Sequence, residues 1–322
     1  MNPQRRLTVR VARIWRQTPH ILAFELTHPW GRPLPGYEAG AHIDVHMPGG
    51  FSRQYSLALA PPAAAPVMSY LIGVKREAAG RGGSASMHER VRAGDLLAVS
   101  APRNTFPLCP QAAQHLLLAG GIGITPLLAM AQALAARGAN FRLCVFARSR
   151  EHLAFANALR EPALAPRLRL HLDQGEAAER IDLHALLAER APGAQLYLCG
   201  PGGFMQAVRD AARHWPEDAL HTEYFAAPDD AGQSAGQPFT LRLAQRGISV
   251  PVAADQSAVD ALHQVGIDIP VSCQQGLCGS CVVPGDGAGA EHHDFCLTAS
   301  ERKTRLALCC ARAKGQELVL QL

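Results

Sequence analysis

The sequence predicts a multidomain chain: an antiparallel β-barrel, then an α/β domain built on a parallel sheet, then a small α+β domain. Short alternating segments separated by Gly and Pro fill the first third of the 322 residues, and strand and helix patterns alternate in the middle. A stretch rich in Pro, Gly and acidic residues at positions 226–238 then interrupts the apolar periodicity. A chain of this length, 48% hydrophobic, can bury ordinary cores in two or three domains.

The first predicted domain covers residues 1–107. Apolar and polar residues alternate there over short runs, which is typical of strands that bury one face. The clearest runs are LTVRVARIW, HIDVHM, SYLIGV and DLLAVS. Because Gly and Pro separate them, the pattern favours an antiparallel barrel or sandwich.

The second predicted domain covers residues 108–226, where strand and helix patterns alternate as they do around a parallel sheet. The uncharged run from Leu116 to Ala136 is long enough to span a bilayer. Glycines and Pro126 interrupt this run, so we predict a strand, a turn and a helix instead of a membrane span.

A linker is predicted at residues 227–237 and a third domain at residues 238–322. This domain begins with the strand patterns FTLRLAQRG and ISVPV, continues with a helix capped by Ser257, and ends with the strand ELVLQL. A loop crowded with cysteines lies between the helix and the last strand. The pattern predicts a small α+β fold.

Charge and the N-terminal segment exclude several classes of function. The net charge is +4 and the isoelectric point is about 8.6, with scattered arginines, which argues against a nucleic-acid or membrane-surface binder. The N-terminal segment has no apolar core before a small-residue cleavage site, so we expect no secretory signal and a cytoplasmic protein. In a reducing cytosol the nine cysteines are expected to be ligands or buried thiols.

The segment CQQGLCGSC places three thiols in one short loop. The spacing Cys273-x4-Cys278-x2-Cys281 is typical of plant-type ferredoxin loops, in which a distant fourth thiolate completes a 2Fe-2S cluster. Either Cys309 or Cys310 can take that place. Glycines in the loop allow the backbone to approach inorganic sulfide and to turn N–H groups toward it.

A structural zinc site is the alternative, because four thiols, or thiols with His292 or His293, also bind zinc. Zinc fingers, however, usually arrange their ligands two by two. The spacing within one Gly-rich loop therefore favours the iron–sulfur cluster, with Cys296 as a spare buried thiol.

The segment from Phe239 to Leu322, with CQQGLCGSC, HHDFCLT and LCCARAKGQELVLQL, resembles the C-terminal ferredoxin domain of the phthalate dioxygenase reductase family, which includes vanillate O-demethylase reductases. The resemblance implies a ferredoxin-like β-grasp fold. In the family the fourth ligand stands one residue before a short Ser-Arg-Ala stretch, which here reads Ala-Arg-Ala at residues 311–313. The match assigns Cys309 as the fourth ligand and makes Cys310 its neighbour.

A flavin is expected between a hydride carrier and the cluster, because the carrier gives two electrons together and the cluster accepts one. The segment RQYSLA resembles the R-x-Y-S flavin signature of ferredoxin-reductase-type barrels. Arg53 is suited to neutralise phosphate, Tyr55 to lie against the flavin, and Ser56 to hydrogen-bond the ring. Alone, this motif is weak, since its residue types are common.

A second segment strengthens the flavin assignment. GVKREAAGRGGSASMHERV, residues 73–91, holds a Gly-Gly-Ser loop before a short helix, and its backbone N–H groups are suited to cradle a phosphate. In the resembled family this loop binds the phosphate of FMN, so the resemblance implies FMN rather than FAD. The candidate residues are Gly73, Lys75, Arg81, Gly82, Gly83, Ser84 and Ser86.

Two further glycine loops imply a pyridine nucleotide. AGGIGITP follows an apolar strand and opens a helix, the context that places a pyrophosphate on helix N-terminal amides. It is not a Rossmann fingerprint, because a proline stands where the third glycine is expected. It matches the family's nucleotide loop, and LYLCGPGGFMQAV matches the family's nicotinamide loop. The candidate residues are Gly121, Gly123, Thr125, Pro126, Cys199, Gly200, Pro201 and Gly202.

Phe225, in TEYFAAP, matches the family's aromatic residue that covers the flavin face. The alternative is that Phe225 is an ordinary phenylalanine of the hydrophobic core. Family resemblance implies that the nucleotide is NADH. The residues themselves leave this choice open, since Arg148 and Arg150 suit a 2′-phosphate, whereas Asp173 suits a free ribose hydroxyl.

The resemblance covers essentially the whole chain and implies a reductase that moves electrons from NADH through FMN and a 2Fe-2S cluster to a Rieske-type terminal oxygenase. No residue is expected to act as acid or base. The substrate of the oxygenase is expected to be vanillate first, then phthalate or another benzoate. The alternatives are a reductase for another acceptor, such as a soluble monooxygenase, or a redox sensor that binds zinc and nucleotide.

Basic residues near the cluster are expected to form a solvated surface rather than a docking patch, namely Arg302, Lys303, Arg305 and Arg312.

Overall fold

The structure is a computed structural model that describes residues 6–78, 80–176, 180–226 and 236–322. The chain divides into two compact units, Met1–Phe225 and Ala226–Leu322. Residues 227–235 of the predicted linker lie outside the described residues.

The first unit opens with a six-stranded antiparallel sheet of order β4-β3-β6-β1-β2-β5. A bridge between Leu57 and Ile72 joins the two ends of this sheet, so it closes into a barrel. Apolar residues at alternate positions, such as Ile43 and Val45, fill the interior. The elements are β1 (Arg6–Thr18), β2 (Ile21–Thr27), β3 (His42–Met47), β4 (Phe51–Ser56), β5 (Ser69–Lys75), α1 (Gly83–Arg90) and β6 (Leu96–Ser100).

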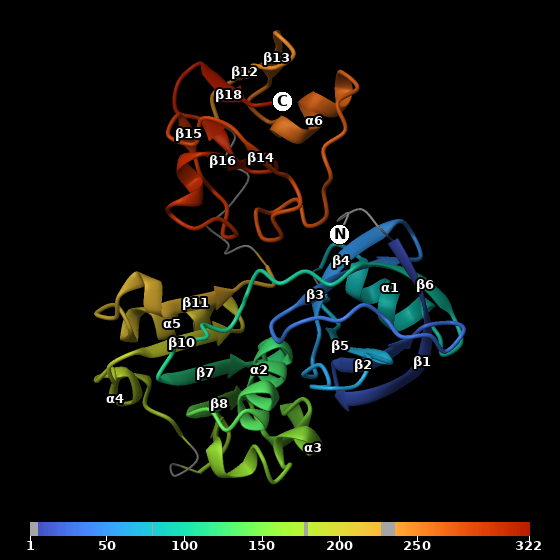
Figure 1. Ribbon diagram of the computed structural model, residues 1–322, viewed down its shortest axis with the longest axis vertical. Coiled ribbons are helices and arrows are strands. Elements are labelled where there is room, and N and C mark those ends of the chain that lie inside the picture. The colour runs from blue at the N-terminus through green and yellow to red at the C-terminus, as the bar shows by residue number, and fades with distance from the viewer. Residues whose placement is uncertain (1–5, 79, 177–179, 227–235) are drawn as a thin grey trace. The chain divides into compact units, whose positions relative to one another are not determined.

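The rest of this unit is a parallel five-stranded sheet of order β11-β10-β7-β8-β9 with helices on both faces (Figure 1). The chain leaves β7 on one side for β8 and β9 and later returns on the other side for β10 and β11. In such sheets, ligands bind at this switch point, outside the carboxyl ends of the strands. The elements are β7 (Gln114–Gly120), α2 (Ile124–Ala136), β8 (Phe141–Ala147), α3 (Ala156–Leu159), β9 (Leu168–Leu172), α4 (Leu183–Leu187), β10 (Ala194–Cys199), α5 (Gly202–Ala211) and β11 (Leu220–Glu223).

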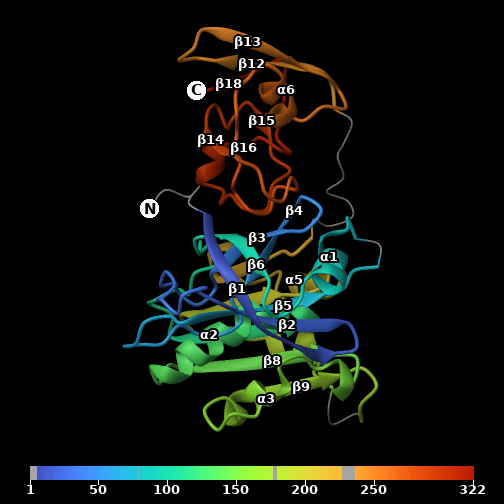
Figure 2. The same ribbon diagram turned by 90° about the vertical axis from the view of Figure 1, so that its right-hand side faces the viewer.

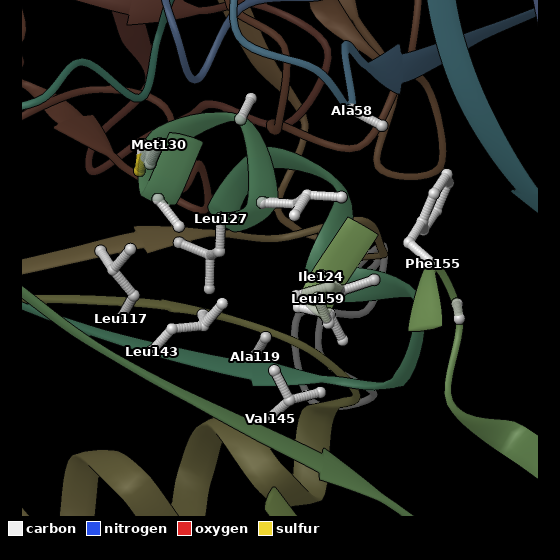
Figure 3. Packing of buried hydrophobic residues seen from close by; sticks show 14 of the residues in the cluster. Ala58, Leu117, Ala119, Ile124, Leu127, Met130, Leu143, Val145, Phe155 and Leu159 are labelled. Atoms are coloured by element: carbon white, nitrogen blue, oxygen red, sulfur yellow. The ribbon is translucent and has the colours of Figure 1, made fainter. Parts of the chain in front are cut away.

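The apolar run of β7 explains why both faces of the sheet are covered. Successive side chains of a strand point to opposite faces. Leu117 packs with Ile124 and Leu127 of α2, as Figure 3 shows. Leu116 and Leu118 pack on the other face, in the cluster that includes α4 and α5.

The barrel and the parallel sheet share an interface within this unit. The backbone N–H of Phe155, which has a left-handed φ of 56°, donates to Gln17 Oε1 of β1 at 3.0 Å. A Cβ added to Gly73 of β5 would stand 3.0 Å from Thr125 Cγ2 and 3.1 Å from Ile122 Cδ1. The missing side chain at Gly73 therefore lets β5 lie against the start of α2.

The second unit is built around β12 (Phe239–Leu243), which pairs antiparallel with β13 (Ile248–Val252) and parallel with β18 (Glu317–Leu320). Helix α6 (Ala258–Gln264) packs its apolar side on this sheet (Figure 2). As predicted, Ser257 caps the helix, since its Oγ accepts from Asp260 N at 3.1 Å. Two short antiparallel pairs complete the unit: β14 (Val282–Pro284) with β16 (Arg305–Ala307), and β15 (Ala290–Glu291) with β17 (Arg312–Ala313).

The observed folds confirm the predicted fold class: an antiparallel barrel, a parallel-sheet α/β fold and a small α+β fold whose first and last strands pair in parallel. The uncharged run from Leu116 to Ala136 forms most of β7, a turn and α2. Among the described residues, no helix has the length and apolar character needed to cross a membrane.

Candidate redox site

Two glycine loops of the first unit lie directly against each other at the carboxyl ends of β7 and β10. A Cβ added to Gly123 would stand 2.2 Å from the carbonyl oxygen of Cys199, and one added to Gly200 would stand 3.0 Å from Gly120 Cα. Only glycine lets two backbones pack this closely. The structure thus brings together the two loops in which the sequence predicts nucleotide binding.

The remaining candidates in these loops shape the starts of two helices. Gly121 has a left-handed φ of 54° with open space where a Cβ would stand. Thr125 is buried, and its hydroxyl donates to a carbonyl of the preceding turn at 3.1 Å. Pro126 lies in the first turn of α2, where no backbone N–H is needed. Pro201 directly precedes α5, which begins at Gly202.

A hydrogen bond joins the barrel to these loops. Ser56 Oγ, at the end of β4, donates to Glu223 Oε2 at 2.9 Å. Glu223 ends β11 and pairs there with Cys199 of β10. Burial raises the pKa of Glu223 to about 7, against the opposing effect of the Ser56 hydrogen bond. Burial, and then the nearby Glu223 charge, also raise the pKa of Cys199. Glu223 is therefore placed to hold a proton near neutral pH.

The sequence motifs do not indicate Glu223, although they indicate Phe225 two positions later. The available signal is an acidic residue at the carboxyl end of a parallel strand, where ligands of such sheets bind. Phe225 itself is 42% exposed and ends the first unit.

Arg53 lies across the start of α1. Its guanidinium donates to the Arg81 carbonyl at 3.1 Å, and a Cβ added to Gly83 would stand 3.1 Å from its Nε. Gly82, just before the helix, has a left-handed φ of 81°. Burial raises the pKa of Tyr55, on the same strand, and keeps its phenol neutral. A guanidinium and a helix N-terminus thus meet at one place, which suits a phosphate group.

Other candidates of this segment have different surroundings. Ser84 Oγ accepts from Glu77 N at 3.1 Å. Ser86 is buried and donates to a backbone carbonyl of the β3–β4 turn at 2.7 Å. Lys75 pairs with Glu77 at 2.7 Å, and Gly73 faces the parallel sheet. Flavin binding by Gly73, Lys75 and Ser86 stays a prediction.

A histidine and an aspartate are paired at the end of β9. His171 Nδ1 accepts from Ile181 N at 2.8 Å, so its Nε2 carries the proton and donates to Asp173 Oδ1 at 3.2 Å. The His171 ring stacks on Phe146, whose ring also contacts Phe204, with centroids 4.9 Å apart in both pairs. Asp173 is therefore held at the carboxyl edge of the sheet.

The four predicted ligand thiols form two pairs in the second unit. Cys273 lies within hydrogen-bonding distance of Cys278, and Cys281 of Cys309. The hydrogen bond from Cys273 lowers the pKa of Cys278, while the same bond, together with burial, raises the pKa of Cys273. Nowhere in the described part of the chain do three metal-binding side chains gather around one point. Two pairs suit two irons that each take two thiolates.

Backbone N–H groups surround these sulfurs. Gln275 N and Leu277 N both donate to Cys273 Sγ at 3.3 Å, and Gly276 N donates to Cys309 Sγ at 3.2 Å. The loop includes three residues with positive φ, and Gly276 is one of them at 72°. These turns direct the N–H groups inward, where donors to cluster sulfur are expected.

The two adjacent cysteines near the C-terminus differ in their contacts. Cys309 Sγ accepts from Gly276 N, whereas Cys310 Sγ donates to the Ala307 carbonyl at 3.5 Å. Both sulfurs lie beside the cluster loop, because a Cβ on Gly276 would stand 2.7 Å from Cys310 Sγ. Cys296 is half-buried, and burial raises its pKa to about 12. The hydrogen bond from Gly276 N favours Cys309 as the fourth ligand, and this choice stays a prediction.

Comparison with known proteins agrees with this geometry. The family model of the 2Fe-2S iron-sulfur cluster binding domain matches residues 241–314. The model of the N-terminal domain of the dimethylamine monooxygenase subunit DmmA-like family matches residues 100–219.

Full-length relatives are also found. The chain is 44% identical to a vanillate O-demethylase oxidoreductase of Pseudomonas sp. (strain HR199 / DSM 7063), over 94% of this chain and 95% of that one. It is 42% identical to the tert-butanol monooxygenase / tert-amyl alcohol desaturase reductase subunit of Aquincola tertiaricarbonis, over 99% and 97%. A solved structure of phthalate dioxygenase reductase is 38% identical, covers 100% of both chains and superposes with a TM-score of 0.72. The chain belongs to the phthalate dioxygenase reductase family.

As a member of the phthalate dioxygenase reductase family, the protein is an oxidoreductase, the reductase component of a multicomponent oxygenase system. It combines a flavin- and NAD-binding reductase fold with a 2Fe-2S domain. The match to the 2Fe-2S domain also decides against the zinc alternative.

The expected basic surface of this reductase needs correction at two positions. Arg312 is buried, and its guanidinium donates to the carbonyls of Gln256 and Gln237 at 2.8 Å each. The Arg312 side chain therefore stabilises the segment that leads into β12. Arg302 is half-buried and turns toward the buried Asp294.

Proposed function

We propose that the protein is a cytoplasmic NADH-dependent reductase that binds FMN in its barrel and passes electrons singly through its 2Fe-2S cluster to a Rieske-type oxygenase. The Ser56–Glu223 hydrogen bond of 2.9 Å carries this proposal. It brings the strand with the flavin signature next to β11 and Cys199, where nicotinamide binding is predicted. Hydride transfer requires this proximity of the two sites.

The proposal of FMN rests on the surroundings of α1. The Arg53 guanidinium meets the first turn of this helix beside the Arg81 carbonyl. These groups, with Gly82, Gly83 and Ser84, would hold a terminal phosphate, and Tyr55 would lie against the flavin.

The proposal of NADH rests on Asp173 and His171. A carboxylate at the carboxyl end of a parallel strand is suited to accept a hydrogen bond from a ribose hydroxyl and repels a 2′-phosphate. The hydrogen bond from His171 Nε2 at 3.2 Å orients this carboxylate. Arg148 and Arg150 would favour the phosphate, so the ratio of activities with the two nucleotides tests the choice.

Bound FMN and the cluster supply the conversion of a two-electron hydride into single electrons. The chain's own residues position these groups. The loops at Gly123 and Gly200 form the nucleotide side, and Cys273, Cys278, Cys281 and Cys309 hold the cluster. Glu223 Oε2, which accepts from Ser56 of the flavin signature, would be placed to hold a proton near neutral pH. This adds a proton-holding residue to a mechanism expected to need none.

The proposed acceptor is an aromatic oxygenase or O-demethylase, with vanillate as the first substrate to test and phthalate or another benzoate next. The names of a relative at 44% identity and of the solved phthalate dioxygenase reductase support this choice. A relative at 42% identity is named as a tert-butanol monooxygenase reductase subunit, so identity alone does not select the substrate.

The test is an anaerobic visible spectrum of the purified protein before and after one equivalent of NADH. We expect flavin and iron–sulfur absorption that bleach together, with about one FMN and two irons per chain. Mass analysis of the released flavin separates FMN from FAD, and kcat/KM with NADH and NADPH separates the nucleotides. Released FAD, or a higher kcat/KM with NADPH, would overturn that part of the proposal. Failure to reduce any aromatic-ring or demethylating Rieske oxygenase would favour another acceptor.

A further inference from the structure

Asp294 is a buried carboxylate near the cluster loop that the proposed electron path does not use. Its side chain is 1% exposed. One carboxylate oxygen lies 3.2 Å from His292 Nδ1, and the other accepts from Leu297 N at 3.0 Å and lies 3.4 Å from the Arg302 guanidinium. Arg302 also donates to the Asp294 carbonyl. Movement of the carboxylate would break these contacts and leave a buried charge without hydrogen-bond partners, which is costly in free energy. The contacts therefore hold the carboxylate in one position.

The contacts of Asp294 also hold the backbone of the segment 292–298. His292 Nε2 hydrogen-bonds the Gly287 carbonyl at 2.9 Å, so the imidazole links Asp294 to the turn before β15. The Leu297 N–H donates to the Asp294 carboxylate and so closes the turn between these two residues. The segment is therefore fixed from both sides through one carboxylate.

This segment supports the cluster loop at Gly276. Phe295 N donates to the Gly276 carbonyl at 2.8 Å, and a Cβ added to Gly276 would stand 2.8 Å from Asp294 Cα. Gly276 thus lies directly on the Asp294 backbone. Its own N–H donates to Cys309 Sγ at 3.2 Å. Contacts therefore run without interruption from the buried carboxylate to a predicted ligand sulfur.

We propose that Asp294 is a positioning residue for the 2Fe-2S cluster: by fixing the segment under Gly276, it keeps the Gly276 N–H directed at the Cys309 sulfur. The inference rests on the 2Fe-2S domain and on Cys309 as a ligand. It is independent of the flavin, of the nucleotide and of the partner oxygenase.

A hydrogen bond to a ligand sulfur acts on the cluster in two ways. It stabilises the reduced, more negatively charged cluster and so raises the midpoint potential. It also holds the ligand in place, which slows the loss of iron. Both effects weaken when the segment 292–298 loosens, even if the domain stays folded.

The test compares Asp294→Ala with Asp294→Asn in the full-length protein. Both variants remove the carboxylate charge, but Asn keeps an acceptor for Leu297 N and the shape of the side chain. We expect the midpoint potential of the Ala variant to lie below that of the Asn variant. We also expect the Ala variant to lose iron to a chelator about tenfold faster. A dye-mediated redox titration followed by the electron paramagnetic resonance of the reduced cluster measures the potential.

Glu317→Gln is the matched control, because Glu317 is a half-exposed carboxylate of the same unit, paired with Arg242 at 3.0 Å. It should leave the potential and the rate of iron loss unchanged. Equal potentials and equal iron loss in the Ala and Asn variants would overturn the inference, even if both unfold at lower temperature. If Asp294→Ala does not fold, Asp294→Ser takes its place, because its shorter side chain does not reach His292. Wild-type protein purified without iron would overturn the cluster assignment itself.

Discussion

The nucleotide loops and the cluster loop both depend on glycine, but for different physical reasons. Gly123 is required because the backbone at Cys199, from a distant part of the chain, comes within contact of it. Gly276 has a φ of 72° and turns a short loop so that its N–H meets a sulfur. The first site is made by packing between distant segments. The second combines the local conformation of the loop with packing on the Asp294 backbone, because a Cβ on Gly276 would also stand 2.8 Å from Asp294 Cα. A change in the nucleotide loops should therefore disturb the fold, whereas a change in the cluster loop should mainly disturb the metal.

Gly123→Ala should have the largest effect. Its Cβ would stand 2.2 Å from a backbone carbonyl oxygen, and no flexible side chain can move away. We expect a loss of about 3 kcal/mol in the free energy of unfolding. Flavin reduction by NADH should be about 100-fold slower, because small displacements of reacting groups have effects of this size. Denaturant unfolding and stopped-flow absorbance measure the two quantities.

Gly36→Ala is the control, since a Cβ there meets nothing within 4 Å and Gly36 lies outside both nucleotide loops. This variant should behave like the wild type in both measurements. Wild-type stability and rate in Gly123→Ala would remove the distinction between the two regions.

Cys309→Ala should remove the cluster and leave the first unit intact. We expect about tenfold less iron per chain, while NADH still reduces the flavin. Cys310→Ala should keep its iron, because Cys310 Sγ contacts the Ala307 carbonyl and Cys309 Sγ accepts from Gly276 N. Iron analysis and the visible spectrum measure both variants. The reverse pattern would assign the fourth ligand to Cys310.

Glu223→Gln tests the contact between the barrel and the nucleotide loops. Burial raises the pKa of Glu223 from 4.5 to about 7, so the folded protein binds this proton more tightly than the unfolded chain. The wild type should therefore lose stability as pH rises from about 4.5 to 7, by on the order of 2 kcal/mol from this group. The Gln variant should lack this loss, and its flavin reduction should lack an inflection near pH 7. Unfolding curves of the two proteins that stay parallel across this window would contradict the assignment.

Gln274→Gly should have the smallest effect and sharpens the comparison at the cluster loop. Gln274 has a left-handed φ of 55°, which glycine adopts without strain. Glycine also loses more entropy on folding, so the net gain in stability should be only about 0.5 kcal/mol. Iron content should not change. A clear loss of stability or of iron would show that the Gln274 side chain contributes more than its backbone conformation.

The cluster loop could be predicted almost completely from the sequence. Three predicted ligands stand within one short segment, and their spacing alone indicates the kind of cluster. The role of Asp294 could not be predicted, because its contacts with His292, Arg302 and the backbone of Gly276 arise only when separate segments pack together.

The nucleotide and flavin side was predictable as separate pieces. The pattern of each glycine loop predicts a turn from strand to helix, and the pattern of the flavin signature predicts a strand. The hydrogen bond between Ser56 and Glu223 joins residues far apart in the chain, and no local pattern marks that pair. Gly73 shows the same limit, since its contacts with Ile122 and Thr125 join distant segments, while its part in flavin binding stays a prediction.

The sequence by itself determined the order of the folds, the cysteine loop and the two glycine loops, because alternation, turn residues and ligand spacing act over a few neighbouring residues. Only the tertiary structure decided which loops meet, which carboxylates are buried and which arginines are exposed. Burial changes the pKa of Glu223 and encloses Asp294 and Arg312, and burial depends on segments distant in the chain.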